Sequence, residues 1–313
     1  TFAPLNIYLM FSLDKKRWQW AALFLLAFVW GGSFILMKRG LDAFSYFQIG
    51  AIRIFFSFLI LLPISIKNLK YINKQNFGYL LASGFLGNFF PAFLFPLAQT
   101  QVPSSLAGIL NGLTPFFTLI IGVLAFKSKP NTLQYIGVFV GFVGASILVS
   151  NGNFSSLAGI NAYALIIVFA TFMYGINANI IRNKLAGLNG IQITSLLFFL
   201  IGPFAGVLLM FTDFTVATQS DKFWTSLLAV LTLSVFASVI LLFIYNNLIH
   251  KSGPIFASSA TYIIPFFALM WGMMDNERVS TLHLISLLII LCGVYLASLR
   301  RIPYLGFVKG LFR

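Results

Sequence analysis

Ten side chains that can bind a small molecule stand inside otherwise apolar stretches of this 313-residue chain. They are Trp30, Ser33, Arg53, Asn88, Asn111, Tyr174, Asn177, Ser238, Thr261 and Tyr262. Amides, hydroxyls, aromatic rings and a guanidinium recognise a ligand by hydrogen bonding, stacking and charge. Catalysis would need a nucleophile with its base, a metal or paired carboxylates. The apolar stretches contain no Gly-x-Ser-x-Gly, no His-Glu-x-x-His and no Asp or Glu near their centres. We therefore expect a binding site, not an enzyme, and no cofactor or metal.

Most of these residues recur in pairs at a nearly constant spacing. Asn111 and Thr261 stand 150 residues apart, and each is followed four residues later by Pro-Phe-Phe. The other pairs are Asn88 with Ser238, Trp30 with Tyr174, and Ser33 with Asn177. A proline frees a backbone carbonyl, which in lipid must find a partner inside the protein. Paired interrupted segments in two halves of a chain are typical of a transporter's binding site.

Composition places the chain in a membrane. Hydrophobic residues make up 59% and charged residues 8%, whereas soluble domains carry about 25% charged residues. We predict an all-α polytopic membrane protein with the lipid bilayer as its surroundings. The net charge of +14 does not indicate nucleic-acid binding, because the Lys and Arg residues lie between the apolar runs and form no basic face. Cys292 is the sole cysteine, so no disulfide can form within the chain.

Ten apolar runs predict ten transmembrane helices. Their ranges are 18–37, 44–64, 77–97, 104–126, 131–149, 158–181, 189–211, 223–248, 254–274 and 281–299. We divide the chain into a lead-in (1–17), two five-helix repeats (18–149 and 158–299) and a basic tail (300–313). We expect the lead-in to be cytoplasmic or interfacial and not a secretory signal, because its basic cluster follows the apolar stretch.

The basic residues predict the orientation. With the N-terminus inside, 15 of the 20 Lys and Arg residues face the cytoplasm, 4 face outside and Arg53 lies within a helix. This asymmetry favours ten helices with both termini cytoplasmic. Because five is odd, the second repeat enters the membrane from the opposite side, so the repeats are inverted. Inverted repeats favour two related conformations, one open to each side, and therefore alternating access.

Three short motifs carry a resemblance to a known family. Trp30-Gly31-Gly32-Ser33-Phe34 with Lys38 resembles the first-helix motif of EamA-type carriers in the drug/metabolite transporter superfamily. Arg53 after Gly50-Ala51-Ile52 resembles the arginine of that family's second helix, and Asn276-Glu277-Arg278 resembles its Gly-Glu-Arg turn. The first-half equivalent, Lys127-Ser128-Lys129-Pro130, lacks the glutamate. The resemblance implies export or exchange of small metabolites such as amino acids across the bacterial inner membrane, through a central cavity.

The role of each candidate has an alternative. Ser, Thr and Asn in membrane helices often bond across helices without touching a ligand, an explanation we favour for Ser33 and Ser238. For Asn88 and Asn111 we favour the cavity, because an unpaired amide in hydrocarbon is unfavourable. Arg53 is either structural or a partner for a substrate carboxylate.

The absence of a mid-helix carboxylate predicts weak or no obligatory proton coupling. The glycines of Gly137-x3-Gly141-x2-Gly144 predict close helix packing, and we favour packing within a functional monomer over dimerisation. A channel, a receptor or a scaffold remains the alternative to a carrier; a channel would need a continuous polar face, and a scaffold would not need the inverted repeat.

Overall fold

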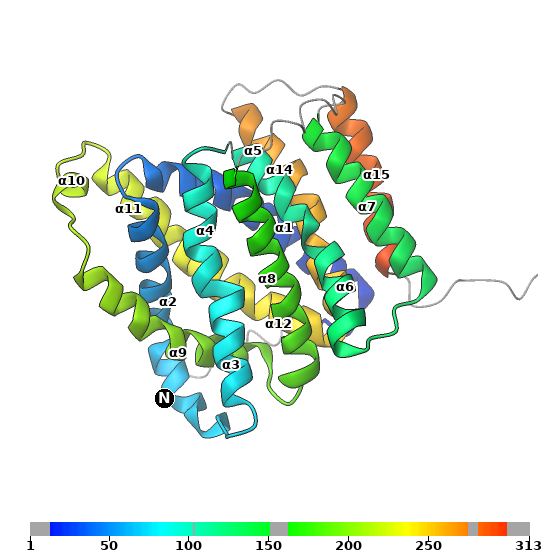
Figure 1. The fold of residues 1–313 in the computed structure, drawn as a ribbon, viewed down its shortest axis with the longest axis horizontal. Coiled ribbons are helices and arrows are strands. Elements are labelled where there is room, and N and C mark those ends of the chain that lie inside the picture. The colour runs from blue at the N-terminus through cyan, green and yellow to red at the C-terminus, as the bar shows by residue number, and fades with distance from the viewer. Residues whose placement is uncertain (1–12, 103, 151–161, 275–280, 299–313) are drawn as a thin grey trace, which may run out of the picture.

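The computed structural model describes residues 13–102, 104–150, 162–274 and 281–298, and these residues form a bundle of helices without a strand (Figure 1). The Asn276-Glu277-Arg278 turn, the first twelve residues and the tail from residue 299 lie outside the described residues.

The first half contains the following elements: α1 (Lys16–Leu41), α2 (Tyr46–Asn68), η2 (Leu69–Tyr71), α3 (Phe77–Gly84), η3 (Phe85–Phe89), α4 (Phe90–Gln99), α5 (Ser104–Leu110), η4 (Asn111–Leu113), α6 (Thr114–Phe126) and α7 (Thr132–Ser150). The second half contains α8 (Ala162–Lys184), α9 (Gly190–Met210), α10 (Thr215–Thr218), α11 (Phe223–Thr232), η6 (Leu233–Ile240), α12 (Leu241–Ser252), α13 (Pro254–Ser258), α14 (Ala260–Met274) and α15 (Thr281–Ser298).

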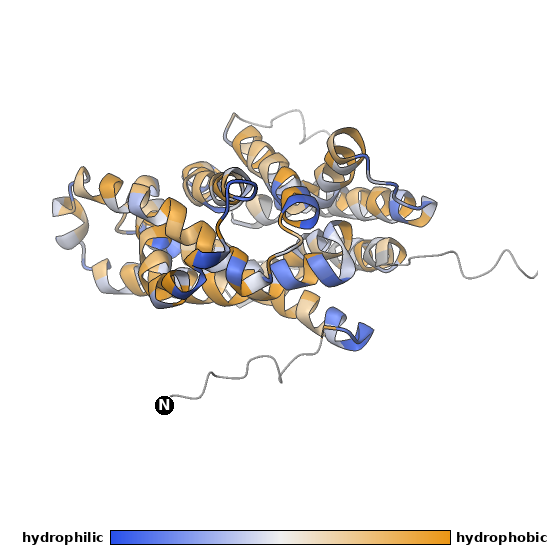
Figure 2. Ribbon diagram, turned by 90° about the horizontal axis from the view of Figure 1, so that it is seen from below, coloured by the Kyte–Doolittle hydropathy of each residue, from blue (hydrophilic) through white to orange (hydrophobic). Residues whose placement is uncertain are grey.

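Helix lies on each of the predicted apolar runs, with ends that differ by a few residues. Six helical stretches are long and apolar enough to cross a membrane: Lys16–Leu41, Tyr46–Tyr71, Phe77–Gln99, Ala162–Lys184, Gly190–Met210 and Phe223–Ser252. Shorter apolar helices cover Asn111–Phe126, Thr132–Gly144, Pro254–Ala268 and Leu284–Ala297. Seen from below, most of the bundle is hydrophobic, and hydrophilic residues gather at the end that faces the viewer (Figure 2).

Equivalent helices of the two halves begin with the same cap. Ser45 and Gln48 form a capping box at the start of α2, and Asn189 and Gln192 form one at the start of α9. The side chain of each cap residue accepts a hydrogen bond from the third helical N–H, and the glutamine side chain returns to the cap. The two glutamines stand 144 residues apart, so the sequence repeat corresponds to a repeated folding signal.

The halves also pack through equivalent contacts. α1 packs on α14 and α8 packs on α6, and these two pairs exchange places under the repeat. A Cβ added at Gly31 would lie 2.8 Å from the Phe267 Cβ, and one added at Gly175 would lie 2.9 Å from the Phe117 Cβ. α2 lies against its own equivalent α9, and the two run in opposite directions (Figure 1). The described helices thus have the arrangement of two repeats related by a pseudo-two-fold axis.

The glycines of α7 contact other helices of the same chain. α7 packs on α15, where a Cβ on Gly293 would lie 2.5 Å from the Gly141 backbone nitrogen. A Cβ on Gly144 would lie 2.9 Å from the Ile290 side chain. Small residues let two membrane helices approach closely, so these glycines serve the α7–α15 contact.

The breaks in the two Pro-Phe-Phe helices fall at different places, contrary to the expected symmetry. η4 interrupts the first segment just before Pro115, and the Thr114 hydroxyl donates to the Asn111 carbonyl at 2.8 Å. Pro115 has no backbone N–H to donate to this carbonyl, so the Thr114 hydroxyl takes the place of the missing donor. In the second half, α13 ends at Ser258 and α14 continues through Pro265.

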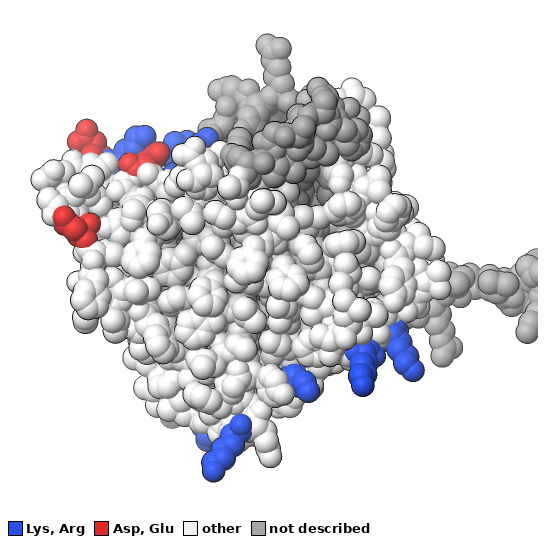
Figure 3. Space-filling model, in the orientation of Figure 1, with Lys and Arg blue, Asp and Glu red and all other residues white. Residues whose placement is uncertain are grey.

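The two ends of the bundle differ in charge. The edge where α2 leads into α3 and α8 leads into α9 carries Lys and Arg without Asp or Glu in this view, whereas the α10 edge carries both signs (Figures 1 and 3). At the α10 end, Asp213 accepts hydrogen bonds from the hydroxyl and the backbone N–H of Thr215, and these bonds lower the pKa of its carboxyl.

We predict that Gly293→Ala lowers the apparent midpoint of thermal unfolding, because the added methyl group meets the backbone of α7. Overpacking of this kind destabilises by about 1–3 kcal/mol. Thermal scans of the purified protein in detergent measure the midpoint. Gly78→Ala is the control, because a Cβ there would meet nothing within 4 Å. Equal midpoints for the two variants would contradict the α7–α15 contact.

Candidate functional site

A polar cavity lies between the two halves. The cavity has a volume of about 90 Å³. Its wall is formed by Trp30, Ser33, Phe34, Met37, Arg53, Gly87, Asn88, Phe95, Asn111, Thr114, Tyr174, Asn177, Ala237, Leu242, Tyr245 and Thr261. Both halves therefore contribute to one cavity wall.

The structure brings eight of the ten predicted residues into this wall. They are Trp30, Ser33, Arg53, Asn88, Asn111, Tyr174, Asn177 and Thr261. They come from α1, α2, η3, η4, α8 and α14, so segments far apart in sequence converge on one space. Which of them contact a ligand stays a prediction.

Tyr262 does not line the cavity. Its side chain is fully buried, its hydroxyl donates to the Val138 carbonyl at 3.1 Å, and its ring fills the space left by Gly141. Adjacent helical residues point about 100° apart. Thr261 can therefore face the cavity while Tyr262 faces α7, and Tyr262 is a packing residue.

Ser238 lies behind the wall and positions a wall residue. Its hydroxyl accepts a hydrogen bond from the Arg53 Nε at 2.7 Å. The backbone beneath Arg53 is also fixed, because the Ser57 hydroxyl contacts both the Arg53 carbonyl (2.7 Å) and the Ser234 carbonyl (3.2 Å). Ser238 thus acts through Arg53, which α2 and η6 hold together.

Two π-helical segments occupy equivalent places beside the cavity. η3 carries Asn88 and η6 carries its repeat partner Ser238. Pro91 is the second residue after η3 and cannot donate a hydrogen bond to the carbonyl four residues earlier, so a wider turn is favoured there. π-Helical turns within α-helices are frequent at functional sites.

The amide side chains of the wall differ in how much hydrogen bonding they have left. Asn177 accepts from the Ser83 hydroxyl at 2.6 Å and packs on Gly87, so it binds η3 and α3 to α8. The Asn88 side chain makes no hydrogen bond with the residues that the structure describes. Ser33 donates to the Val29 carbonyl of its own helix at 3.0 Å. Asn88 is therefore the amide with the most hydrogen-bonding capacity left for a ligand.

Two aromatic pairs flank the cavity symmetrically. Trp30 meets Tyr245 edge to face, with ring centroids 5.2 Å apart, and Tyr174 stacks on Phe95 at 5.9 Å. The Trp30 Nε1 also donates to the Ala237 carbonyl at 3.3 Å. The rings make the lining largely apolar, and only a few polar atoms are held in fixed positions within it. Such a lining is typical of a site for a small organic molecule.

Sequence reasoning missed Phe95 and Tyr245, although the signal was present. The two stand 150 residues apart, as do Asn88 and Ser238. They follow that pair by seven residues, which is two helical turns and returns the side chain to the same face.

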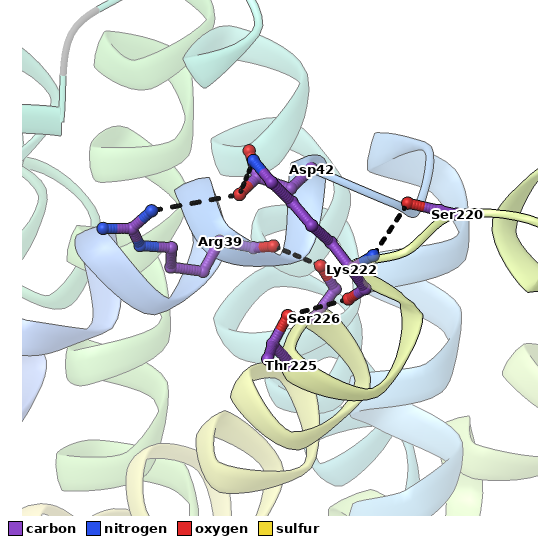
Figure 4. Close-up of polar contacts among 6 residues, drawn as sticks. All are labelled: Arg39, Asp42, Ser220, Lys222, Thr225 and Ser226. Atoms are coloured by element: carbon purple, nitrogen blue, oxygen red, sulfur yellow. Dashed lines mark hydrogen bonds and ion pairs between the residues drawn. The ribbon is translucent and has the colours of Figure 1, made fainter.

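Polar contacts join the two halves at both ends of the bundle. At one end, the Ser226 hydroxyl donates to the Arg39 carbonyl at 2.6 Å and Lys222 pairs with Asp42 at 3.2 Å (Figure 4). At the other end, Lys251 pairs with Asp14 at 2.5 Å. These ion pairs are exposed, so each contributes little stability and opens readily.

Comparison with known proteins gives a consistent result. Residues 17–150 and 161–299 each match the EamA-like transporter family. The chain is 26% identical over 295 residues to a protein of Escherichia coli strain K12 described as the uncharacterized inner membrane transporter YedA, covering 89% of this chain and 90% of that one. It is 29% identical over 141 residues to an uncharacterized transporter of Haemophilus influenzae, covering 44% of this chain and 46% of that one. A protein of known crystal structure shares the fold, with a TM-score of 0.68, 14% identity and coverage of 90% of this chain and 97% of that one.

We predict that a cysteine at position 88 reacts with a water-soluble thiol reagent and one at position 262 does not. Asn88→Cys and Tyr262→Cys would be made in a Cys292→Ala background, which removes the sole native thiol. The reason is that Asn88 lines the cavity, whereas Tyr262 is fully buried against α7. Mass spectrometry of the labelled protein in membranes gives the readout. Labelling at 262 but not at 88 would contradict the cavity described here.

Proposed function

The chain belongs to the EamA-like transporter family, and we propose that it carries a small organic metabolite across the bacterial inner membrane by opening its cavity to each side in turn. The observation that carries this proposal is the symmetry of the cavity. Trp30 with Tyr174 and Phe95 with Tyr245 are repeat partners, and each half contributes one residue of each pair to the wall. A binding site on the axis between two inverted repeats is the arrangement that alternating access requires.

The proposed topology has ten transmembrane helices with both termini in the cytoplasm. Six stretches meet the length and apolarity of a full span, and the shorter apolar helices complete the two sets of five. The charge difference between the ends of the bundle supports this orientation (Figure 3), because the cytoplasmic side of a membrane protein is enriched in Lys and Arg.

The equivalent contacts indicate how the two access states would be related. The α1–α14 and α6–α8 contacts exchange roles under the repeat, so one state converts to the other when the halves exchange conformations. The ion pairs Asp42–Lys222 and Asp14–Lys251 join the halves at opposite ends of the bundle, where we propose that they act as gates. Opening one while keeping the other would expose the cavity to one side only.

A carrier explains the cavity better than a channel does. The wall combines aromatic and polar residues from both halves around one site, which suits a protein that binds its substrate during transport. The proposed substrate is an amino acid or a compound of similar size, and one chain is sufficient for transport because both halves of the site lie in one chain.

We predict saturable, trans-stimulated uptake of such a metabolite in proteoliposomes, with weaker uptake for Asn88→Ala. Loss of one hydrogen bond to the substrate is worth about 1 kcal/mol, so the concentration for half-maximal uptake should rise about fivefold to tenfold. Counterflow of labelled compound into vesicles loaded with unlabelled compound is the measurement.

Asn183→Ala is the matched control, because Asn183 bonds to the Asn179 carbonyl at the exposed end of α8 and lies outside the cavity. Uptake that rises linearly with concentration and shows no trans-stimulation would favour a channel instead.

We also predict that a pH gradient is not required. No Asp or Glu is among the described residues that line the cavity, so no carboxylate is there to take up and release a proton. Counterflow rates should be equal with and without an imposed pH gradient, measured with and without a protonophore. Strict dependence on the gradient would contradict this prediction.

A further inference from the structure

We infer that the transported metabolite is an organic monoanion with one carboxylate, which binds to Arg53 and is preferred over the zwitterionic amino acid of the same skeleton. The inference rests on the proposed transport function and narrows its substrate class.

The first step is the charge of the wall. Arg53 is the one charged residue among the described residues that line the cavity, and the other polar wall residues are amides, hydroxyls and aromatic side chains. The described acidic residues, Asp14, Asp42, Asp213 and Asp221, lie at the ends of the bundle or in its loops. The cavity therefore carries one positive charge without a counter-ion in its wall.

The second step is the way the guanidinium is held. Its Nε donates to Ser238 at 2.7 Å, and no other hydrogen bond joins the guanidinium to the residues that the structure describes. A guanidinium has five N–H donors, so the two terminal nitrogens retain theirs. Two parallel N–H groups match the two oxygens of a carboxylate.

The third step compares a monoanion with a zwitterion. A charge taken out of water needs a partner of opposite sign, because desolvation is otherwise unfavourable. A carboxylate neutralises the cavity completely. An amino acid brings an ammonium as well, which leaves the net charge at +1 and finds amide oxygens and ring faces but no acid in the wall.

The fourth step is the rest of the substrate. The Trp30–Tyr245 and Phe95–Tyr174 pairs offer ring surface. An organic acid with a short apolar chain or a ring would place its carboxylate at Arg53 and its apolar part between these rings. Asn88 would be free to bond a hydroxyl or oxo group.

The experiment compares compounds that share one carbon skeleton and carry a net negative charge, a zwitterionic pair or no charge. The probes are 2-hydroxy-4-methylpentanoate, leucine and 2-hydroxy-4-methylpentanamide, together with 3-phenyllactate, phenylalanine and 3-phenyllactamide. Counterflow in proteoliposomes and thermal stabilisation of the detergent-purified protein are both measured. We expect a hydroxy acid to bind at least tenfold more tightly than its amino acid, and the neutral amide to bind most weakly.

Variants of Arg53 test whether its guanidinium binds the substrate carboxylate. A hydrogen bond to a charged group contributes about 1.5–3 kcal/mol, so Arg53→Gln should weaken binding of the acid roughly tenfold to hundredfold and leave the amide unchanged. Arg53→Lys keeps the charge but loses the paired geometry, so it should fall between Arg53→Gln and the natural protein. Lys67→Gln is the control, because it removes one exposed charge from the same helix outside the cavity.

The outcomes separate the two proposals. Counterflow of amino acids that exceeds that of the hydroxy acids, or Arg53→Gln that binds acids like the natural protein, would overturn the inference and leave the carrier function standing. Absence of trans-stimulation for every probe, with folded protein in the vesicles, would overturn both.

Discussion

A polar group inside a bilayer must find its hydrogen-bond partner within the protein, and this requirement sorts the polar side chains of the helices into two sets. The first set is satisfied locally or by a neighbouring helix. Ser65 contacts the carbonyls of Leu61 and Ser195, and Asn179 donates to the carbonyls of Thr118 and Gly175. The second set, which includes Asn88 and the terminal nitrogens of Arg53, retains unused capacity and faces the cavity. At the candidate site, Asn88 and Arg53 thus retain hydrogen-bonding groups that a substrate could use.

Glycine makes the rest of the arrangement possible. Gly31 and Gly175 let equivalent helices from opposite halves approach to contact, and Gly87 makes room for the Asn177 side chain beside the cavity. Because the same small residue stands at both repeat positions, the two inter-half contacts have similar shapes. Similar contacts have similar energies, as the proposed exchange between two conformations of the bundle would require.

The sequence predicts the elements and the repeat well, because apolar runs and capping signals are local. Ser45–Gln48 and Asn189–Gln192 can be recognised by spacing alone. It predicts side-chain direction less well. Tyr262 stands beside Thr261 in sequence but faces α7, and only the position of Gly141 decides that. Likewise, the break before α14 lies at Ser259 and not at Pro265, since the packing of α13 and α14 determines it. Phe95 and Tyr245 were predictable from the repeat, but polarity was the wrong criterion for finding them.

Arg53 has no acidic partner in the cavity wall, and this has a consequence for the proposed carrier when no substrate is bound. Closing the cavity without substrate would strip water from a guanidinium whose neighbour is a neutral hydroxyl, and the penalty for one uncompensated buried ion is several kcal/mol. In the proposed cycle, a bound carboxylate would remove most of that penalty, and the loaded cavity would close more easily than the empty one. Return of the empty carrier would then be the slow step, and the protein would work as an exchanger that moves one molecule out for each molecule it takes in. One positive charge without a partner in the cavity wall would in this way couple two opposite fluxes.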